Sequence, residues 1–128
     1  MKVLLDTHAL LWYYQDSPEL SDKVKELVAD ESSDVAISVA SFWEIGVKLS
    51  VRKLELGEPF EDFADTVVYA HKFKVLGIEL PHIAHISRLP MHHRDPFDRM
   101  IIAQSFCEEM PVVTVDLKFE RYGVATIW

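Results

Sequence analysis

The stretch VLLDTHALLWYY, residues 3–14, decides the fold class, because a short apolar run in it passes directly into a helical pattern. The run at 3–5 has the composition of a buried strand and ends at Asp6. A helix from Ala9 to Tyr14 follows, and Thr7 can cap its amino terminus. A strand followed so closely by a helix is typical of proteins in which the two elements alternate around a parallel sheet.

The same alternation continues to the end of the chain. The expected strands are apolar runs rather than alternating patterns, which indicates a parallel sheet covered by helices on both faces. We therefore predict an α/β fold, with three α/β/α layers around a central, mainly parallel sheet. No repeat or linker interrupts residues 1–128, so a single domain is expected. Further strands are expected at 34–38, 74–80, 111–116 and 123–128, and further helices at 17–30, 40–50, 58–73, 82–89 and 96–107.

Composition places the chain among globular proteins. Apolar residues make up 49% and charged residues 27% of the 128 residues, enough for a hydrophobic core. The amino terminus lacks a signal-peptide pattern, and no apolar run reaches membrane-spanning length. Cys107 is the single cysteine, which excludes an internal disulfide and a cysteine-based zinc cluster. We expect a soluble, cytoplasmic protein without a membrane partner.

The formal net charge of -8 argues against nonspecific binding to polyphosphates. Bound divalent cations can reverse the sign of an acidic site, however, so the distribution of the acids matters more than their sum. Asp6 and Asp116 directly follow expected strands, Glu44 lies shortly after another, and Asp95 and Asp98 open a helix. Ligands of open parallel sheets bind beyond the carboxyl ends of the strands, where these acids are expected to lie.

Converging carboxylates repel one another unless a cation binds, and oxygen-only sites suit Mg²⁺ or Mn²⁺. Such ions can activate water for phosphodiester cleavage. Each acid also has a purely structural explanation. Asp95 is a good helix N-cap and Asp98 a capping-box partner, Glu44 fits a solvated helix position, and Asp116 fits a turn. Asp6 is the hardest to explain in this way, because the strand before it is so apolar.

Four stretches carry a family resemblance: LLDTHALLW (4–12), SVASFWEIGVK (38–48), LPHIAHISRLPMHHRDPFDRMIIAQS (80–105) and VVTVDLKFERYGV (112–124). In this order they resemble the PIN-domain family, specifically the VapC-type toxins of prokaryotic toxin–antitoxin pairs. The resemblance implies a PIN-like fold and a metal-dependent endoribonuclease that leaves 5′-phosphate and 3′-hydroxyl ends. Arg52 and Ser105 depart from residues common in relatives, but neither belongs to the acid set.

The resemblance also implies roles for individual residues. Asp6, Glu44, Asp98 and Asp116 match the family's metal-binding acids, and Asp95 matches an auxiliary position whose metal role stays open. Ser41 and Thr114 match polar positions beside those acids that orient waters or carboxylates. His93, Arg94 and Arg99 are candidates for contacts to the RNA backbone, although each arginine has an ion pair with a neighbouring acid as its alternative. The expected cofactor is Mg²⁺ or Mn²⁺.

Two further groups of residues suggest a function only weakly. The histidines could suggest zinc, but no supporting ligand frame accompanies them. The basic residues near Glu44 read as a solvated face. The histidines are His82, His85, His92 and His93, and the basic residues are Lys48, Arg52 and Lys53.

The expected partners are an RNA substrate, a cognate antitoxin and a second copy of the chain, because VapC-type toxins dimerise and are wrapped by an antitoxin segment. A phosphatase of the haloacid-dehalogenase type is disfavoured, since its second aspartate is replaced by His8. The remaining alternative is a noncatalytic or DNA-directed PIN-fold nucleic-acid-binding protein.

Overall fold

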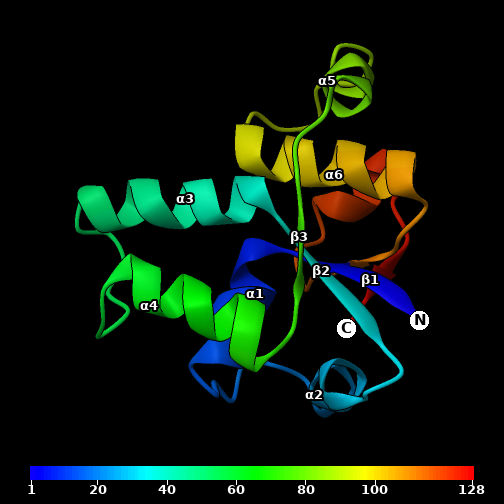
Figure 1. The fold of residues 1–128 in the computed structure, drawn as a ribbon. Coiled ribbons are helices and arrows are strands. Elements are labelled where there is room, and N and C mark those ends of the chain that lie inside the picture. The colour runs from blue at the N-terminus through cyan, green and yellow to red at the C-terminus, as the bar shows by residue number, and fades with distance from the viewer.

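The computed structural model describes residues 1–128 and is built on a five-stranded sheet of order β3-β2-β1-β4-β5 (Figure 1). Every neighbouring pair of strands is parallel, which confirms the predicted fold class. The final strand lies at an edge, as expected. The strands are β1 (Lys2–Leu5), β2 (Asp34–Ser38), β3 (Lys74–Leu76), β4 (Val112–Val113) and β5 (Thr126–Ile127).

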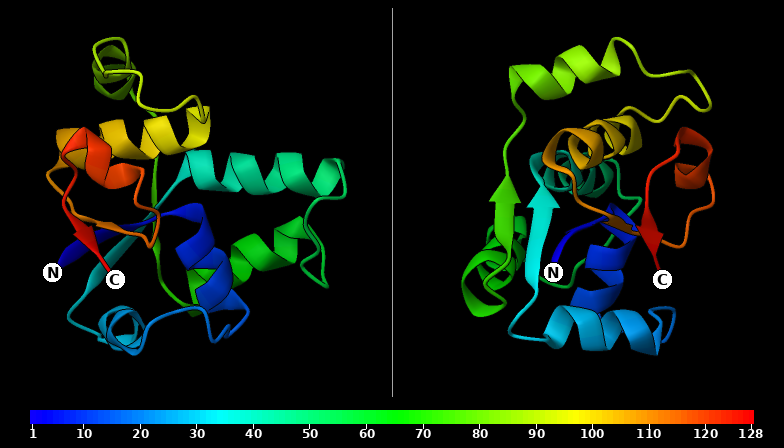
Figure 2. Two further views of the ribbon diagram at one scale, coloured as in Figure 1. Left: turned by 180° about the vertical axis from the view of Figure 1, so that it is seen from behind. Right: turned by 90° about the vertical axis from the view of Figure 1, so that its right-hand side faces the viewer.

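Helices connect the strands and cover both faces of the sheet (Figures 1 and 2). Alternation along β1 sends Val3 and Leu5 to a core cluster shared with α1, α2 and α4, while Leu4 joins a second cluster with α6. One core lies on each face of the sheet, between the sheet and the helices that cover that face, which gives three layers. The helices are α1 (Thr7–Tyr14), α2 (Asp22–Ala29), α3 (Val39–Ser50), α4 (Phe60–Asp65), the π turn η1 (Thr66–Ala70), α5 (Leu80–Ile86), α6 (Pro96–Glu108) and the 3₁₀ turn η2 (Phe119–Tyr122).

Several local expectations differ from the structure. The residue that caps α1 is Asp6 rather than Thr7, because the Asp6 carboxylate accepts the Ala9 N–H at 2.8 Å. The single helix expected at 58–73 is α4 followed by η1, where the His71 N–H donates to the Thr66 carbonyl five residues earlier. The strand expected at 111–116 pairs only at Val112–Val113, and η2 was not expected.

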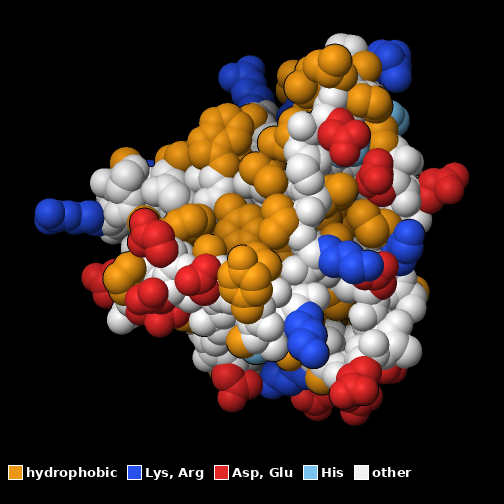
Figure 3. Space-filling model, in the orientation of Figure 1, with side chains coloured by type: hydrophobic (Ala, Val, Ile, Leu, Met, Phe, Trp, Pro, Cys, Tyr) orange, Lys and Arg blue, Asp and Glu red, His pale blue; other side chains and the backbone are white.

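The helix α3 starts directly after β2 and lies near both α1 and α6. Its outer side carries Val39, Trp43 and Val47, which are spaced four residues apart and are 37%, 60% and 40% exposed. Figure 3 shows apolar side chains exposed on this face of the molecule, between α3 and β3 and up to α5. No helix in the structure has both the length and the apolar character needed to cross a membrane.

Candidate active site

The strand order gathers the predicted acids at one edge of the sheet. Because β1 lies between β2 and β4, the carboxyl ends of these three strands are neighbours. Asp6 follows β1, Asp116 lies just beyond β4, and Glu44 is carried by α3, which starts where β2 ends. Asp98 lies in the first turn of α6, which packs beside α3. The predicted gathering of acids beyond the strand ends is therefore present.

Asp6 is an almost fully buried carboxylate without an ion-pair partner. It is 4% exposed. Its Oδ1 accepts the Ala9 N–H at 2.8 Å and its Oδ2 accepts the Thr114 hydroxyl at 2.6 Å. Burial raises the pKa of Asp6, while these two hydrogen bonds and the charge of His8 oppose the rise. A buried, uncompensated charge is costly to the fold and is typical of functional sites.

Thr114 links Asp6 to Asp116. Its hydroxyl donates to Asp6 and accepts the Asp116 N–H at 3.0 Å, so one buried side chain positions both acids. The Asp116 Oδ1 accepts the Lys118 N–H at 2.9 Å, and its other oxygen has no hydrogen bond. The negative charge of Asp116 also contributes to the raised pKa of Asp6. These contacts make Thr114 a neighbour of the acids, as the sequence suggested.

Glu44 is held by contacts that sequence reasoning only partly foresaw. It is 5% exposed, which excludes the solvated helix position. The Thr7 hydroxyl donates to its Oε1 at 2.7 Å and lies 3.0 Å from the Ser41 hydroxyl. Lys48 forms an ion pair with its Oε2 at 2.8 Å, so the expectation that Lys48 is simply solvated was wrong. Thr7 was assigned only a capping role, and its position beside Asp6 was the available signal.

The two aspartates of α6 have different roles. The Asp95 Oδ1 accepts the N–H groups of Phe97 and Asp98 at 2.9 and 3.0 Å, which makes Asp95 the N-cap. The Asp98 side chain makes no capping contact; its Oδ2 lies 3.2 Å from the His93 Nε2 and its Oδ1 has no hydrogen bond. Burial, with the charges of Asp95 and Glu44, raises the pKa of Asp98 to about 6, although His93 opposes this.

The two arginines around these aspartates differ. Arg99 is buried and donates to the Pro90 carbonyl at 2.8 Å and to the Tyr122 hydroxyl at 3.2 Å, so it supports the loop before α6. Arg94 is exposed. Neither forms the intramolecular ion pair offered as its alternative, since the only ion pairs join other residues. Tyr122, which holds both Arg99 and His93, carried no signal in the sequence.

The donor set fits a hard cation. It consists of carboxylate and hydroxyl oxygens, and Asp98 and Asp116 each keep one oxygen without a hydrogen bond. No three His, Cys, Asp or Glu side chains converge closely enough to hold one ion as they now lie. The acids approach in two groups, Asp6 with Asp116 and Glu44 with Asp98. A hard cation held by one or two of these carboxylates would take its remaining ligands from water.

Two of the histidines considered as possible zinc ligands, His82 and His85, contact other residues instead. His82 is buried in a capping box with Glu79, and its Nε2 lies 3.1 Å from a Glu108 carboxylate oxygen. His85 stacks on Phe106. These contacts occupy both side chains within the fold.

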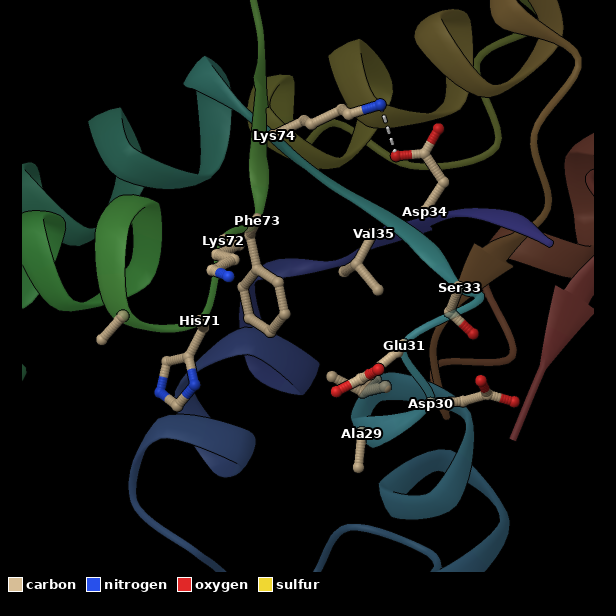
Figure 4. Close-up of a pocket in the computed structure, with 12 residues that line it drawn as sticks. Ala29, Asp30, Glu31, Ser33, Asp34, Val35, His71, Lys72, Phe73 and Lys74 are labelled. Carbon is tan, nitrogen blue, oxygen red and sulfur yellow. Dashed lines mark ion pairs between the residues drawn. The ribbon is translucent and has the colours of Figure 1, made fainter.

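A roomy hollow lies at the opposite edge of the sheet, where the strands begin. It has a volume of about 580 Å³ and lies between the end of α2 and the starts of β2 and β3 (Figure 4). Asp34 and Lys74 face each other there in an ion pair of 2.8 Å. None of the predicted site residues lines it.

Comparison with known families accounts for the acid-rich edge. The sequence profile of the PIN domain matches residues 3–125. The chain belongs to the PIN domain family. PIN domains are generally nucleases that use divalent metal ions, and the four acids of this PIN domain lie together at one edge. No curated protein matches the chain.

Three solved structures share this PIN fold. VapBC2 from Rickettsia felis, bound to a DNA fragment of its promoter, superposes with a TM-score of 0.74 at 16% identity, covering 99% of this chain and 98% of that one. FitAcB from Neisseria gonorrhoeae gives a TM-score of 0.67 at 19% identity, covering 98% and 96%. FitAB bound to an IR36 DNA fragment gives 0.66 at 19% identity, covering 98% and 93%.

Proposed function

We propose that this PIN domain, comprising residues 1–128, is a Mg²⁺- or Mn²⁺-dependent endoribonuclease that acts in the cytoplasm as the toxin of a toxin–antitoxin pair. The observation that carries the proposal is the Asp6 carboxylate, buried without a cation at the edge where three other acids gather. Folding tolerates such a charge at a cost, and a bound divalent cation removes that cost. The site therefore has the chemistry of a metal-dependent hydrolase.

Each acid has a role in this proposal. Asp6, Asp98 and Asp116 hold the metal, and Glu44 completes the site or positions the attacking water. The metal supplies a water of lowered pKa and stabilises charge on the phosphate. Support comes from the free oxygens of Asp98 and Asp116, which are available as ligands without breaking a hydrogen bond.

Polar neighbours of the acids would orient them. Thr114 keeps Asp6 and Asp116 in a fixed relation, and Ser41 lies within hydrogen-bond distance of the Thr7 hydroxyl that donates to Glu44. Asp95 would act through its cap, which fixes the first turn of α6, rather than as a ligand. Products are expected to carry a 5′-phosphate and a 3′-hydroxyl.

An RNA contact is assigned to an exposed basic side chain that lies just before the helix carrying Asp98. Arg94 is exposed and directly precedes Asp95, so its guanidinium can reach a phosphate. Arg99 is buried and bonded to Pro90 and Tyr122, which leaves it a supporting role. A single arginine in a protein of net charge -8 leaves metal ions to supply most of the attraction for phosphate.

Protein partners are proposed from the apolar surface. Val39, Trp43 and Val47 form an exposed apolar row on α3, of the kind that protein interfaces cover (Figure 3). We assign this face to a second copy of the chain and expect an antitoxin to bind elsewhere on the dimer. The structures of VapBC2 and FitAcB share the fold of this chain.

The deciding experiment is incubation of the purified protein with total RNA, with and without EDTA, followed by mapping of the cleaved ends. Metal-dependent cuts with 5′-phosphate ends are expected, and single-stranded DNA of matching sequence serves as a parallel substrate. Absence of metal-dependent cleavage across several RNAs contradicts the nuclease proposal, and preferential cleavage of DNA supports the DNA-directed alternative.

Toxicity is tested separately in cells. Expression of the protein alone should arrest growth, and co-expression of a small protein encoded beside it should restore growth. Harmless overexpression of an enzyme that cleaves RNA in vitro contradicts the toxin role while leaving the nuclease role intact.

A further inference from the structure

The side chains behind Asp98 form a hydrogen-bonded chain that ends on Tyr122. The Asp98 Oδ2 lies 3.2 Å from the His93 Nε2, and the His93 Nδ1 lies 2.7 Å from the Tyr122 hydroxyl. The same hydroxyl lies 3.2 Å from the Arg99 Nη1 and 3.1 Å from the His93 backbone nitrogen. Three groups from two segments therefore meet at the phenol oxygen of Tyr122, a residue that is 8% exposed.

Counting donors and acceptors at this oxygen settles the direction of each hydrogen bond. A phenol hydroxyl has one proton and two lone pairs. The Arg99 guanidinium and the His93 backbone N–H can only donate, so they occupy both lone pairs. The single proton is left for the His93 Nδ1 at 2.7 Å, which is a far better acceptor position than the His93 carbonyl at 3.4 Å.

The count then fixes the state of the imidazole. Because the His93 Nδ1 accepts, the ring proton of a neutral imidazole resides on Nε2, the nitrogen that faces Asp98. We infer that the Tyr122 hydroxyl is a positioning group that selects the Nε2–H tautomer of His93 and so directs a hydrogen-bond donor at Oδ2 of Asp98. Oδ1 is thereby left as the oxygen available to a metal.

This inference rests on the proposed function, because it makes Tyr122 and His93 supports of a metal ligand. Groups that hold metal ligands from behind commonly contribute a factor of 10 to 100 in metal affinity or activity. Tyr122 belongs to η2, just beyond Asp116, whereas His93 and Asp98 flank the start of α6. The hydroxyl therefore also joins the segments that carry two of the four acids.

The first test reads the tautomer directly. Protein labelled with ¹⁵N at its six histidines is examined by ¹⁵N–¹H correlation NMR above pH 7.5 without metal, and His93→Gln assigns the His93 signals. The wild type should show a proton on Nε2 and a hydrogen-bonded Nδ1, and Tyr122→Phe should move Nδ1 to the value of a free imidazole nitrogen. A proton on Nδ1 in the wild type, or an unmoved Nδ1 in Tyr122→Phe, overturns the inference.

The second test asks whether Tyr122 acts through His93. Mn²⁺ affinity is measured by electron paramagnetic resonance for Tyr122→Phe, His93→Gln and the double variant. Each single change should weaken Mn²⁺ binding about tenfold, and the double variant should be no weaker than His93→Gln alone. Independent, multiplying losses overturn the inference. Tyr69→Phe, at a 74% exposed position, is the matched control and should bind Mn²⁺ as the wild type does.

Folding and function are kept apart in these tests. Circular dichroism confirms that each variant is folded, and if Tyr122→Phe is not, unchanged Mn²⁺ affinity in His93→Gln alone overturns the inference. Neither test uses RNA. A protein that binds Mn²⁺ with the expected dependence on Tyr122 but cleaves no RNA therefore refutes the proposed nuclease and leaves the positioning role standing.

Discussion

The two edges of the sheet hold acids in opposite electrostatic states. At the amino edge, the hydrogen bond from Lys74 lowers the pKa of Asp34, and the pair lines the roomy hollow of Figure 4. At the carboxyl edge, burial raises the pKa of Asp6 and Asp98. The acids there outnumber the basic side chains that pair with them. Asp34 at the amino edge therefore has an ion-pair partner, whereas Asp6 at the carboxyl edge has none.

This difference shows that the size of a hollow is a poor guide to function here. A charge with a partner has already been stabilised by folding, so it has little left to offer a ligand. The negative charge of buried carboxylates that lack a cation is not neutralised until an ion binds. These carboxylates also lie beyond the strand ends, where parallel sheets bind ligands. Four predictions test this contrast between the two edges.

The largest expected effect comes from exchanging one carboxylate at each edge. Asp6→Asn should lower RNA cleavage roughly 1,000-fold, because a metal ion contributes several kcal/mol to the transition state. Asp34→Asn, at the amino edge, should leave the rate unchanged. Initial rates at saturating Mg²⁺ measure both. Wild-type cleavage by folded Asp6→Asn would remove the acid from the site.

A smaller loss is expected when the support of Asp6 is removed. Thr114→Val keeps the shape of the side chain but deletes the donor to Asp6 and the acceptor for the Asp116 N–H. Cleavage should fall roughly 10- to 100-fold, and the free energy of unfolding should fall by about 1–3 kcal/mol. Thr66→Val, an exposed hydroxyl that donates only to the Asp62 carbonyl, is the control. Equal effects at the two positions contradict a special role for Thr114.

The third prediction concerns stability and pH. In the folded protein the pKa of Asp98 is about 6, above its ordinary value, so ionisation of Asp98 disfavours folding. The cost is absent below the ordinary value and complete above about pH 6. Asp98→Asn should therefore stabilise the metal-free protein at pH 7.5, by on the order of 2 kcal/mol, with a smaller gain at pH 5. Urea unfolding in EDTA measures both, and an equal gain at the two pH values contradicts the assignment.

The smallest effect is expected from breaking the ion pair at the amino edge. Lys74→Gln removes the partner of Asp34, yet Lys74 is exposed and such pairs contribute little. The melting temperature should change by less than about 3 °C, and the change should shrink further in 0.5 M salt. Thermal denaturation at two salt concentrations is sufficient. A large, salt-insensitive loss shows that the pair is structural and weakens the contrast between the edges.

Sequence reasoning predicted the layers and the position of the acids beyond the strand ends because both depend on local patterns. Apolar runs mark strands of a buried parallel sheet, and an acid after such a run lies at its carboxyl end wherever the strand sits in the order. The cap at Asp95 was also predictable, since a residue before proline at a helix start is a natural N-cap, although its metal role was left open. These local patterns made the parallel sheet predictable, and the structure confirms it.

Contacts between distant segments were not predictable in the same way. Thr7 looked like a cap because its partners, Ser41 and Glu44, lie on another helix. Lys48 looked solvated because its pairing with Glu44 depends on burial of that acid. Tyr122 gave no signal at all, since its hydroxyl gathers groups about 20 to 30 residues away along the chain. Local periodicity contains none of this information.

The hydrogen bond between Thr114 and Asp6 joins residues separated by 108 positions. During synthesis the central strand β1 therefore leaves the ribosome well before its neighbour β4 and the acid that follows β4. A growing or truncated chain that ends before Val112 therefore presents Asp6 without Thr114 or Asp116. If the enzyme cuts RNA as proposed, its site is therefore incomplete until the ribosome has synthesised β4 and Asp116.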